Sequence, residues 1–152
     1  MILPLVKLPS PILSTVCTEV EAAEFGIGLA ETCQNMLDTM RINRGCGIAA
    51  PQVGLTRRII VWAWGENLEH VYQMVNPKIE LAGPTRVDFE GCLSVPGRQA
   101  KISRSETVNV TWQDPMTGDT HSETLTGFKA VVMQHEYDHL NGVTIMDRKI
   151  RS

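Results

Sequence analysis

The sequence predicts an α+β fold in which antiparallel strands surround one central, buried helix. The segment 127–141 has apolar residues on nearly its whole circumference at helical spacing, which is typical of a helix in the middle of a domain. Several short segments of alternating polarity precede it and are bounded by turn residues, as β-strands are. These predicted strands are 57–64, 70–81, 106–113 and 120–126.

The elements before that helix follow from spacing and turn composition. A helix is predicted over Val20–Ile42, interrupted near Gly26 and Gly28 and ending before Gly45. Strands 57–64 and 70–81 are joined by the turn GENLE, and strands 106–113 and 120–126 by the hairpin turn DPMTGD. The apolar residues at helical spacing in the first helix are Leu29, Cys33, Met36 and Met40.

The predicted helix 127–141 is stopped by Gly142, the residue type that favours the position after a helix C-cap. A His–Glu–His cluster lies on it, and such polar groups need partners because burying them unpaired is costly. At 100° per residue, one face carries Phe128, Val131, Val132, His135 and His139. The opposite face carries Ala130, Met133, Tyr137 and Leu140.

Composition narrows the class of protein. The 152 residues are predicted to form one domain, residues 1–152, and their net charge of −3 without a basic run argues against nucleic acid or an anionic membrane as partner. The apolar N-terminus is broken by prolines, and no later segment approaches the roughly 20 apolar residues of a membrane span, so a cytoplasmic location is expected. The four cysteines form no CxxC pair and are interpreted as reduced thiols.

The stretch MQHEYDHLNG (133–142) has the spacing of a helical metal site. His135 and His139 are four residues apart, so both imidazoles can reach one ion from the same helix face. Glu136 can lie beside that ion, in position to act on a bound water. A catalytic site of this kind needs a third protein ligand and one open position.

The third ligand has to come from elsewhere in the chain. Downstream of Leu140 there is no histidine and a single acidic residue, Asp147. Upstream, His70 and His121 lie in polar, turn-proximal contexts that are typical of surface histidines. Cys92 lies in the largely apolar FEGCLSVPG, where a lone cysteine would be a buried structural thiol, but an incomplete His–Glu–His helix favours it as a ligand. The predicted ligand set is Cys92, His135 and His139, with water in the fourth position.

Three stretches together resemble the peptide deformylase family: GCGIAAPQ (45–52), EGCLS (90–94) and QHEYDH (134–139). The resemblance covers about residues 5–148. It implies a metal-dependent hydrolase that removes the N-formyl group from the formyl-methionine of nascent polypeptides and releases formate. It also implies one divalent ion per chain on Cys92, His135 and His139, natively Fe(II), with zinc, nickel or cobalt able to substitute.

The resemblance further implies the roles of the remaining site residues. A metal-bound water attacks the formyl carbon with Glu136 as general acid/base, and Gln52 and the backbone N–H of Leu93 stabilise the developing oxyanion. Apolar side chains, including Leu93, are expected to hold the methionine side chain, and the glycines to admit an extended peptide. The predicted substrate-binding residues are Gly45, Cys46, Gly47, Ile48, Gly91, Val131 and Val132.

Two other functions remain open on the residues alone. One is a metallopeptidase or deacylase with a different substrate class. The other is a non-catalytic module with a closed, four-ligand metal, for which no fourth ligand is evident. Glu90 is a structural carboxylate, a partner of Arg104 or a support for a ligand histidine, and Asp138 has the same alternatives. Cys46 is interpreted as a small apolar filler, not a ligand.

The chain departs from the family at its end. Bacterial members usually continue into a further C-terminal helix, which in some docks on the ribosome, whereas this sequence ends at MDRKIRS. A complete fold with full chemistry is expected, and any transient ribosome association is expected to occur without that helix. The short end suggests a phage, organellar or minimal version, acting in a bacterial or phage-infected cytoplasm or in an organelle.

Overall fold

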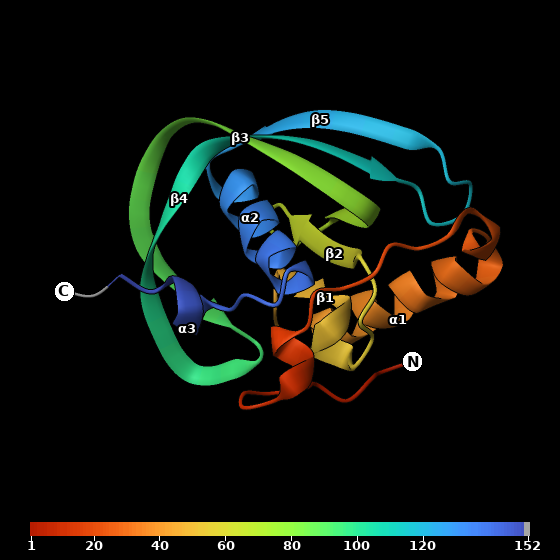
Figure 1. The fold of residues 1–152 in the computed structure, drawn as a ribbon, viewed down its shortest axis with the longest axis horizontal. Coiled ribbons are helices and arrows are strands. Elements are labelled where there is room, and N and C mark those ends of the chain that lie inside the picture. Colours follow the sequence, from red (N-terminus) through yellow and green to blue (C-terminus); the bar gives the residue numbers. More distant parts are fainter. Residues whose placement is uncertain (151–152) are drawn as a thin grey trace.

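One antiparallel sheet and the helix α2 (Phe128–Leu140) that packs against it organise the fold (Figure 1). The computed structural model describes residues 1–150. Its strands are β1 (Gly47–Ala49), β2 (Ile59–Trp64), β3 (His70–Cys92), β4 (Val95–Gln113) and β5 (Thr120–Thr126). Its helices are η1 (Pro11–Ser14), η2 (Ala22–Glu24), α1 (Ile27–Ile42), η3 (Ala50–Val53), α2 (Phe128–Leu140) and α3 (Ile145–Arg148). The predicted α+β class with an antiparallel sheet is confirmed.

The strands pair in sequence order, β1-β2-β3-β4-β5, and every pairing is antiparallel. β3 and β4 form a long hairpin whose register shifts between Val75 and Lys78, between Ala82 and Thr85, and between Gly91 and Cys92. Such irregularities bend a strand and increase its twist. Figure 1 shows the result: the hairpin curves around α2, so that its far end returns toward the helix.

The predicted extents of these two strands were wrong. β3 continues eleven residues beyond the predicted end at position 81, to Cys92, and β4 begins at Val95 instead of 106. Residues 83–89 are all exposed, so this part of β3 lacks the apolar alternation by which a half-buried strand is recognised. The strands predicted at 57–64 and 120–126 are confirmed as β2 and β5.

The first predicted helix begins later than expected. The predicted interruption near Gly26 is confirmed, since its φ of 141° is not helical, and α1 starts at Ile27 and continues through Gly28. Before the interruption there is only the 3₁₀ turn η2. α1 lays one face on β2 and forms a core with it, so the predicted apolar spacing is confirmed. The α1 residues in this core are Leu29, Cys33, Met36, Leu37 and Met40.

α2 is buried along most of its length. Nine of its residues are buried, and its apolar side chains pack against Trp62 and Met74 and against residues of β4 and β5. Its first residue is an exception to the predicted apolar face, since Phe128 is 57% exposed. Asn141 is the C-cap and Gly142, with a φ of 73°, follows it, as predicted.

Among residues 1–150, no helix is long and apolar enough to cross a membrane.

Candidate metal centre and active site

Three side chains that could hold a metal ion meet where the β3–β4 hairpin returns to α2. Cys92 is the last residue of β3, and His135 and His139 lie one turn apart on α2. One donor atom of each lies within 4.8 Å of the others, and Cys92 Sγ is 3.4 Å from His139 Nε2. A thiolate with two imidazoles is a donor set that suits Fe(II), zinc and related divalent ions. The structure therefore brings together all three predicted ligands.

The two other candidate ligands lie away from this cluster. His70 and His121 are exposed, and each stacks on a tryptophan, His70 on Trp64 and His121 on Trp112. Stacking on an aromatic ring accounts for both without an ion.

Glu90 sets the orientation of His135. Its Oε1 lies 2.9 Å from His135 Nδ1, and the carboxylate also accepts hydrogen bonds of 2.9 and 3.0 Å from Arg104. Burial by itself would raise the pKa of Glu90, but the hydrogen bonds from His135 and Arg104 prevail and lower it to about 2. An ionised carboxylate only accepts, so Nδ1 carries the proton and Nε2 is left for an ion. Glu90 thus both pairs with Arg104 and supports a ligand histidine.

Glu136 is the buried carboxylate beside the donor atoms. It is 4% exposed, its Oε2 is 4.0 Å from His135 Nε2, and its Oε1 has no hydrogen-bond partner within residues 1–150. Burial raises the pKa of Glu136 to about 7, although the charge of His135 opposes this. A carboxyl group with a pKa near neutrality can both accept and return a proton at physiological pH.

The two histidines differ in how they hold a proton. Burial disfavours the charged form of His135, but Glu136, Cys92 and Glu90 outweigh it and raise its pKa to about 10. Burial and the charge of His135 together lower the pKa of His139 to about 3. His139 is therefore already neutral, whereas binding of an ion at His135 must release a proton.

Gln52 is held in one orientation close to Cys92. Its side chain is 1% exposed, its Oε1 accepts from the backbone N–H of Ala49 at 2.8 Å, and its Nε2 donates to Ser94 Oγ at 3.2 Å. The same amide lies 3.6 Å from Cys92 Sγ. These contacts direct the amide N–H groups of Gln52 toward the metal-binding cluster. Ser94 belongs to the EGCLS motif, but its role in orienting Gln52 was not predicted.

A cavity of about 1170 Å³ opens beside the donor atoms. The predicted site residues that line it are Gly45, Cys46, Gly47, Gln52, Gly91, Cys92, Leu93, Val131, Val132, His135 and Glu136. Its lining also includes Arg44, Arg86, Phe89 and Arg98, which the sequence did not single out. Three of these come from the unpredicted part of the β3–β4 hairpin, and no local pattern marks them.

The assignment of Ile48 as a substrate-binding residue is corrected by the structure. Its side chain is fully buried in the core between α1 and β2 and does not line the cavity. Successive side chains of a strand point to opposite faces, so Ile48 faces α1 when Gly47 faces the cavity.

Gly47 is packed against the carboxylate of Glu136. A Cβ at this position would lie 2.5 Å from Glu136 Oε2 and 3.0 Å from its Cδ. We expect Gly47→Ala to displace Glu136 and lower kcat by about 10- to 100-fold, because small misplacements of a proton-transfer group are costly. The measurement is kcat of the metal-loaded protein with a formylated peptide, the substrate that the motif resemblance implies.

Gly28→Ala is the matched control for this substitution. Gly28 lies in α1, and a Cβ there would meet nothing within 4 Å. Alanine is also the better helix former, so activity should be unchanged. Equal activity of Gly47→Ala and Gly28→Ala would show that the position of Glu136 is not critical.

The Glu90–Arg104 pair predicts strongly non-additive mutations. Both side chains are at least nine-tenths buried and joined by two hydrogen bonds. Removing either partner leaves the other with an incompletely paired buried charge, so the separate losses of Glu90→Gln and Arg104→Gln should add up to more than the loss of the double variant. Urea unfolding of the four metal-free proteins should give a coupling free energy of about 1–3 kcal/mol. Additive losses would contradict a direct pair.

Comparison with known proteins places the chain in a family. The sequence model of polypeptide deformylase matches residues 2–152. The chain belongs to the polypeptide deformylase family. The family resemblance inferred from the three motifs is confirmed, and with it the prediction that the chain is an enzyme.

Individual polypeptide deformylases match over nearly the whole chain. The peptide deformylase of Dictyoglomus thermophilum is 38% identical over 144 residues, which cover 95% of this chain and 90% of the relative. The crystal structure of the Thermotoga maritima peptide deformylase superimposes with a TM-score of 0.93 at 36% identity, covering 99% of both chains. An actinonin-bound class I type b peptide deformylase from Acinetobacter baumannii gives a TM-score of 0.90 at 34% identity, again covering 99% of both. Polypeptide deformylases are metal-dependent, in agreement with the Cys92, His135 and His139 cluster.

Proposed function

We propose that this chain, as a single catalytic domain over residues 1–152, removes the N-formyl group from the formyl-methionine of nascent polypeptides. The products are formate and a free α-amine, and the expected location is the compartment where such chains are made. The observation that carries the proposal is the meeting of the three donor atoms within 4.8 Å, beside a buried Glu136 with a free oxygen. Membership of the family supports the choice of reaction.

One divalent ion would be held by Cys92, His135 and His139, with Fe(II) as the native ion and zinc, nickel or cobalt as substitutes. The fit is supported by the donor chemistry and by the hydrogen bond that leaves Nε2 of His135 for coordination. Such an ion supplies Lewis acidity and lowers the pKa of a water from 15.7 to about 7. The proposal includes a central position for α2, because a helix that is buried over most of its surface holds both histidines in fixed positions.

Glu136 would accept the proton of the attacking water and deliver it to the leaving amine. Its pKa of about 7 allows it to serve in both directions. Negative charge develops on the formyl oxygen, where the Gln52 amide and the backbone N–H of Leu93 would donate to it. Loss of one such donor typically costs about 3 kcal/mol of transition-state stabilisation.

The peptide would lie along β1, which is an edge strand of the sheet. Gly45 and Gly47 leave room for an extended backbone, and an edge strand offers unpaired N–H and C=O groups to it. Leu93, Val131 and Val132 line the same cavity and would hold the methionine side chain. Cys46 and Gly91 complete this wall of the cavity.

The decisive experiment is formate release from a short formyl-methionyl peptide by protein loaded anaerobically with Fe(II), or with nickel. Rapid release is expected, and the acetyl-methionyl analogue should be turned over far more slowly. A methyl group is worth only about 1–3 kcal/mol in an apolar pocket, so rejection of acetyl requires steric closure beside the ion. Comparable rates for the two acyl groups would contradict that closure, and cleavage of internal peptide bonds would favour a peptidase.

A further inference from the structure

A chain of ion pairs runs from His135 to the short C-terminal helix α3. Glu90 accepts from His135 and Arg104, as described above. Arg104 Nη1 also donates to Asp138 Oδ2 at 2.5 Å. Arg148 of α3 completes the chain, with Nη2 2.9 Å from Asp138 Oδ1 and Nε 3.1 Å from Oδ2. Positive and negative groups alternate along its whole length.

Arg148 balances the charge of this chain. Glu90 and Asp138 are both nearly buried, and once an ion on Nε2 leaves His135 neutral, Arg104 alone cannot neutralise two carboxylates. Arg104 uses Nε and Nη2 for Glu90, which leaves Nη1 for Asp138. Within residues 1–150, Asp138 Oδ1 has Arg148 as its only side-chain partner. Without Arg148, Asp138 would compete with Glu90 for Arg104, because an unpaired buried carboxylate is costly.

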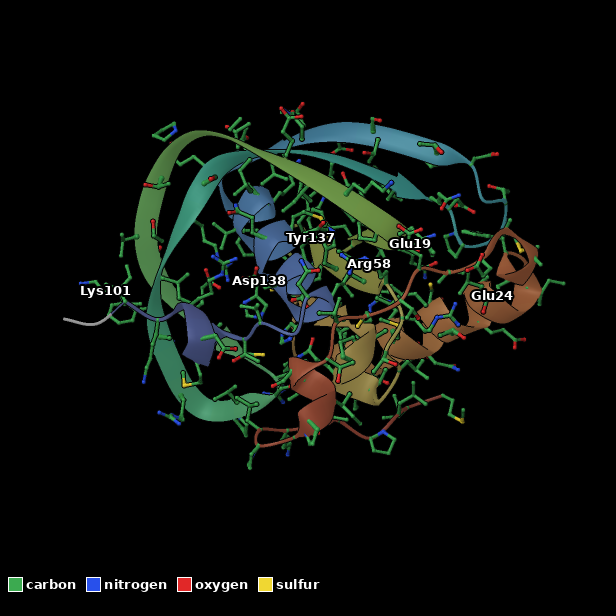
Figure 2. All side chains as sticks on the ribbon, viewed as in Figure 1. Glu19, Glu24, Arg58, Lys101, Tyr137 and Asp138 are labelled. Carbon is green, nitrogen blue, oxygen red and sulfur yellow. The ribbon has the colours of Figure 1, made fainter. Side chains whose placement is uncertain are left out.

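α3 is fixed well enough to present Arg148 in one place. Thr144 caps the helix by accepting from the N–H of Met146, and Asp147 accepts from the N–H of Thr144. Ile145 is 1% exposed in a small core beneath the β3–β4 hairpin, and Cys92 packs against the same core. Figure 2 shows Asp138 on α2 beside α3. The C-terminal helix therefore contacts Asp138, at the far end of this ion-pair chain, and the small core against which Cys92 packs.

We propose that Arg148 is a positioning residue for the metal centre: by pairing with Asp138 it keeps Arg104 on Glu90, and Glu90 on the Nδ1 of His135. The proposal rests on the metal-dependent function proposed above. Arg148 touches neither the donor atoms nor the cavity, so it acts only through the three intervening side chains. Its position after the last motif kept it out of the predicted site.

The test compares Arg148→Gln with wild type in the cobalt- and zinc-loaded proteins. Arg148 is 52% exposed, so the variant should fold. Mutation of residues that support metal ligands typically lowers metal affinity by about 10- to 100-fold. Arg148 is the outermost residue of the ion-pair chain, so Arg148→Gln should speed metal transfer to a chelator by about 10-fold. The visible absorption of bound Co(II) should also change, and kcat should fall while KM stays the same. Arg148→Lys keeps the charge but has fewer hydrogen-bond donors, so its rate of metal loss and its Co(II) spectrum should lie between those of wild type and Arg148→Gln.

Arg57→Gln is the matched control. Arg57 forms a similar two-bond pair with Glu24, which Figure 2 shows far from α3. This variant should keep the wild-type rate of metal loss and the wild-type Co(II) spectrum. Wild-type metal loss and spectrum in Arg148→Gln, or an equal change in Arg57→Gln, would overturn the proposal. Metal loss and spectrum are read without turnover, so a failure of the proposed deformylation would show separately, as absence of formate from metal-replete wild type.

Discussion

Replacement of Glu136 by glutamine is expected to slow formate release by about 10²- to 10⁴-fold, the range that a general acid/base contributes. The amide has almost the same shape as the carboxyl group, but it cannot accept the proton of the attacking water. Glu136 is not among the three clustered donors, so the variant should still bind one ion per chain. The measurements are kcat with nickel-loaded protein and metal content after dialysis.

A control and a second readout accompany this variant. Glu31→Gln replaces an exposed glutamate of α1 and should leave kcat unchanged.

Because burial raises the pKa of Glu136 from 4.5 to about 7, ionising it at pH 8 costs folding free energy in the metal-free protein. Glu136→Gln removes that cost, so metal-free variant protein should be more stable than wild type at pH 8. If Glu136→Gln kept more than a tenth of the wild-type kcat, Glu136 would be ruled out as the proton carrier.

Replacement of His139 by alanine is expected to abolish stable metal binding. Two of the three donors would remain. Metal affinity should fall by more than the 10- to 100-fold that is typical when a residue that merely supports a ligand is mutated. Formate release should then drop to the level of chelator-treated wild type. Metal content after dialysis and isothermal titration with zinc provide the measurement.

His121→Ala is the matched control for the loss of a histidine. His121 is exposed, stacks on Trp112 and is not one of the three clustered donors, so its variant should keep one ion per chain. Retention of a full equivalent of metal by His139→Ala would mean that His139 is not a ligand. The third donor would then have to be sought among other side chains of the cavity.

Prediction from the sequence succeeded where the signal is local. His135 and His139 share a helix face because side chains four residues apart are neighbours on any α-helix. The same reasoning placed Gly142 after the C-cap, where its φ of 73° suits glycine. Cys92 was selected by comparing the surroundings of the available candidates, and the structure brings its sulfur to 3.4 Å from His139 Nε2.

Prediction failed where the signal is weak or long-range. The helix expected from Val20 begins at Ile27, because Gly26 interrupts a segment whose composition is otherwise helical. The middle of the β3–β4 hairpin was missed because it is exposed and carries no apolar alternation. Ile48 was placed in the cavity by its motif, whereas the direction of its side chain depends on which face of β1 meets α1.

The family, the α+β class and the helix that carries His135, Glu136 and His139 follow from the amino-acid sequence alone. Each rests on short motifs or on periodicity, which act over a few residues of chain. The contact of Gly47 with Glu136 emerges only in the folded chain, and so does the connection of Arg148 to His135 through Asp138, Arg104 and Glu90. These contacts join segments far apart in the chain, and they depend on how the long hairpin bends around α2, a property of packing that no local pattern encodes.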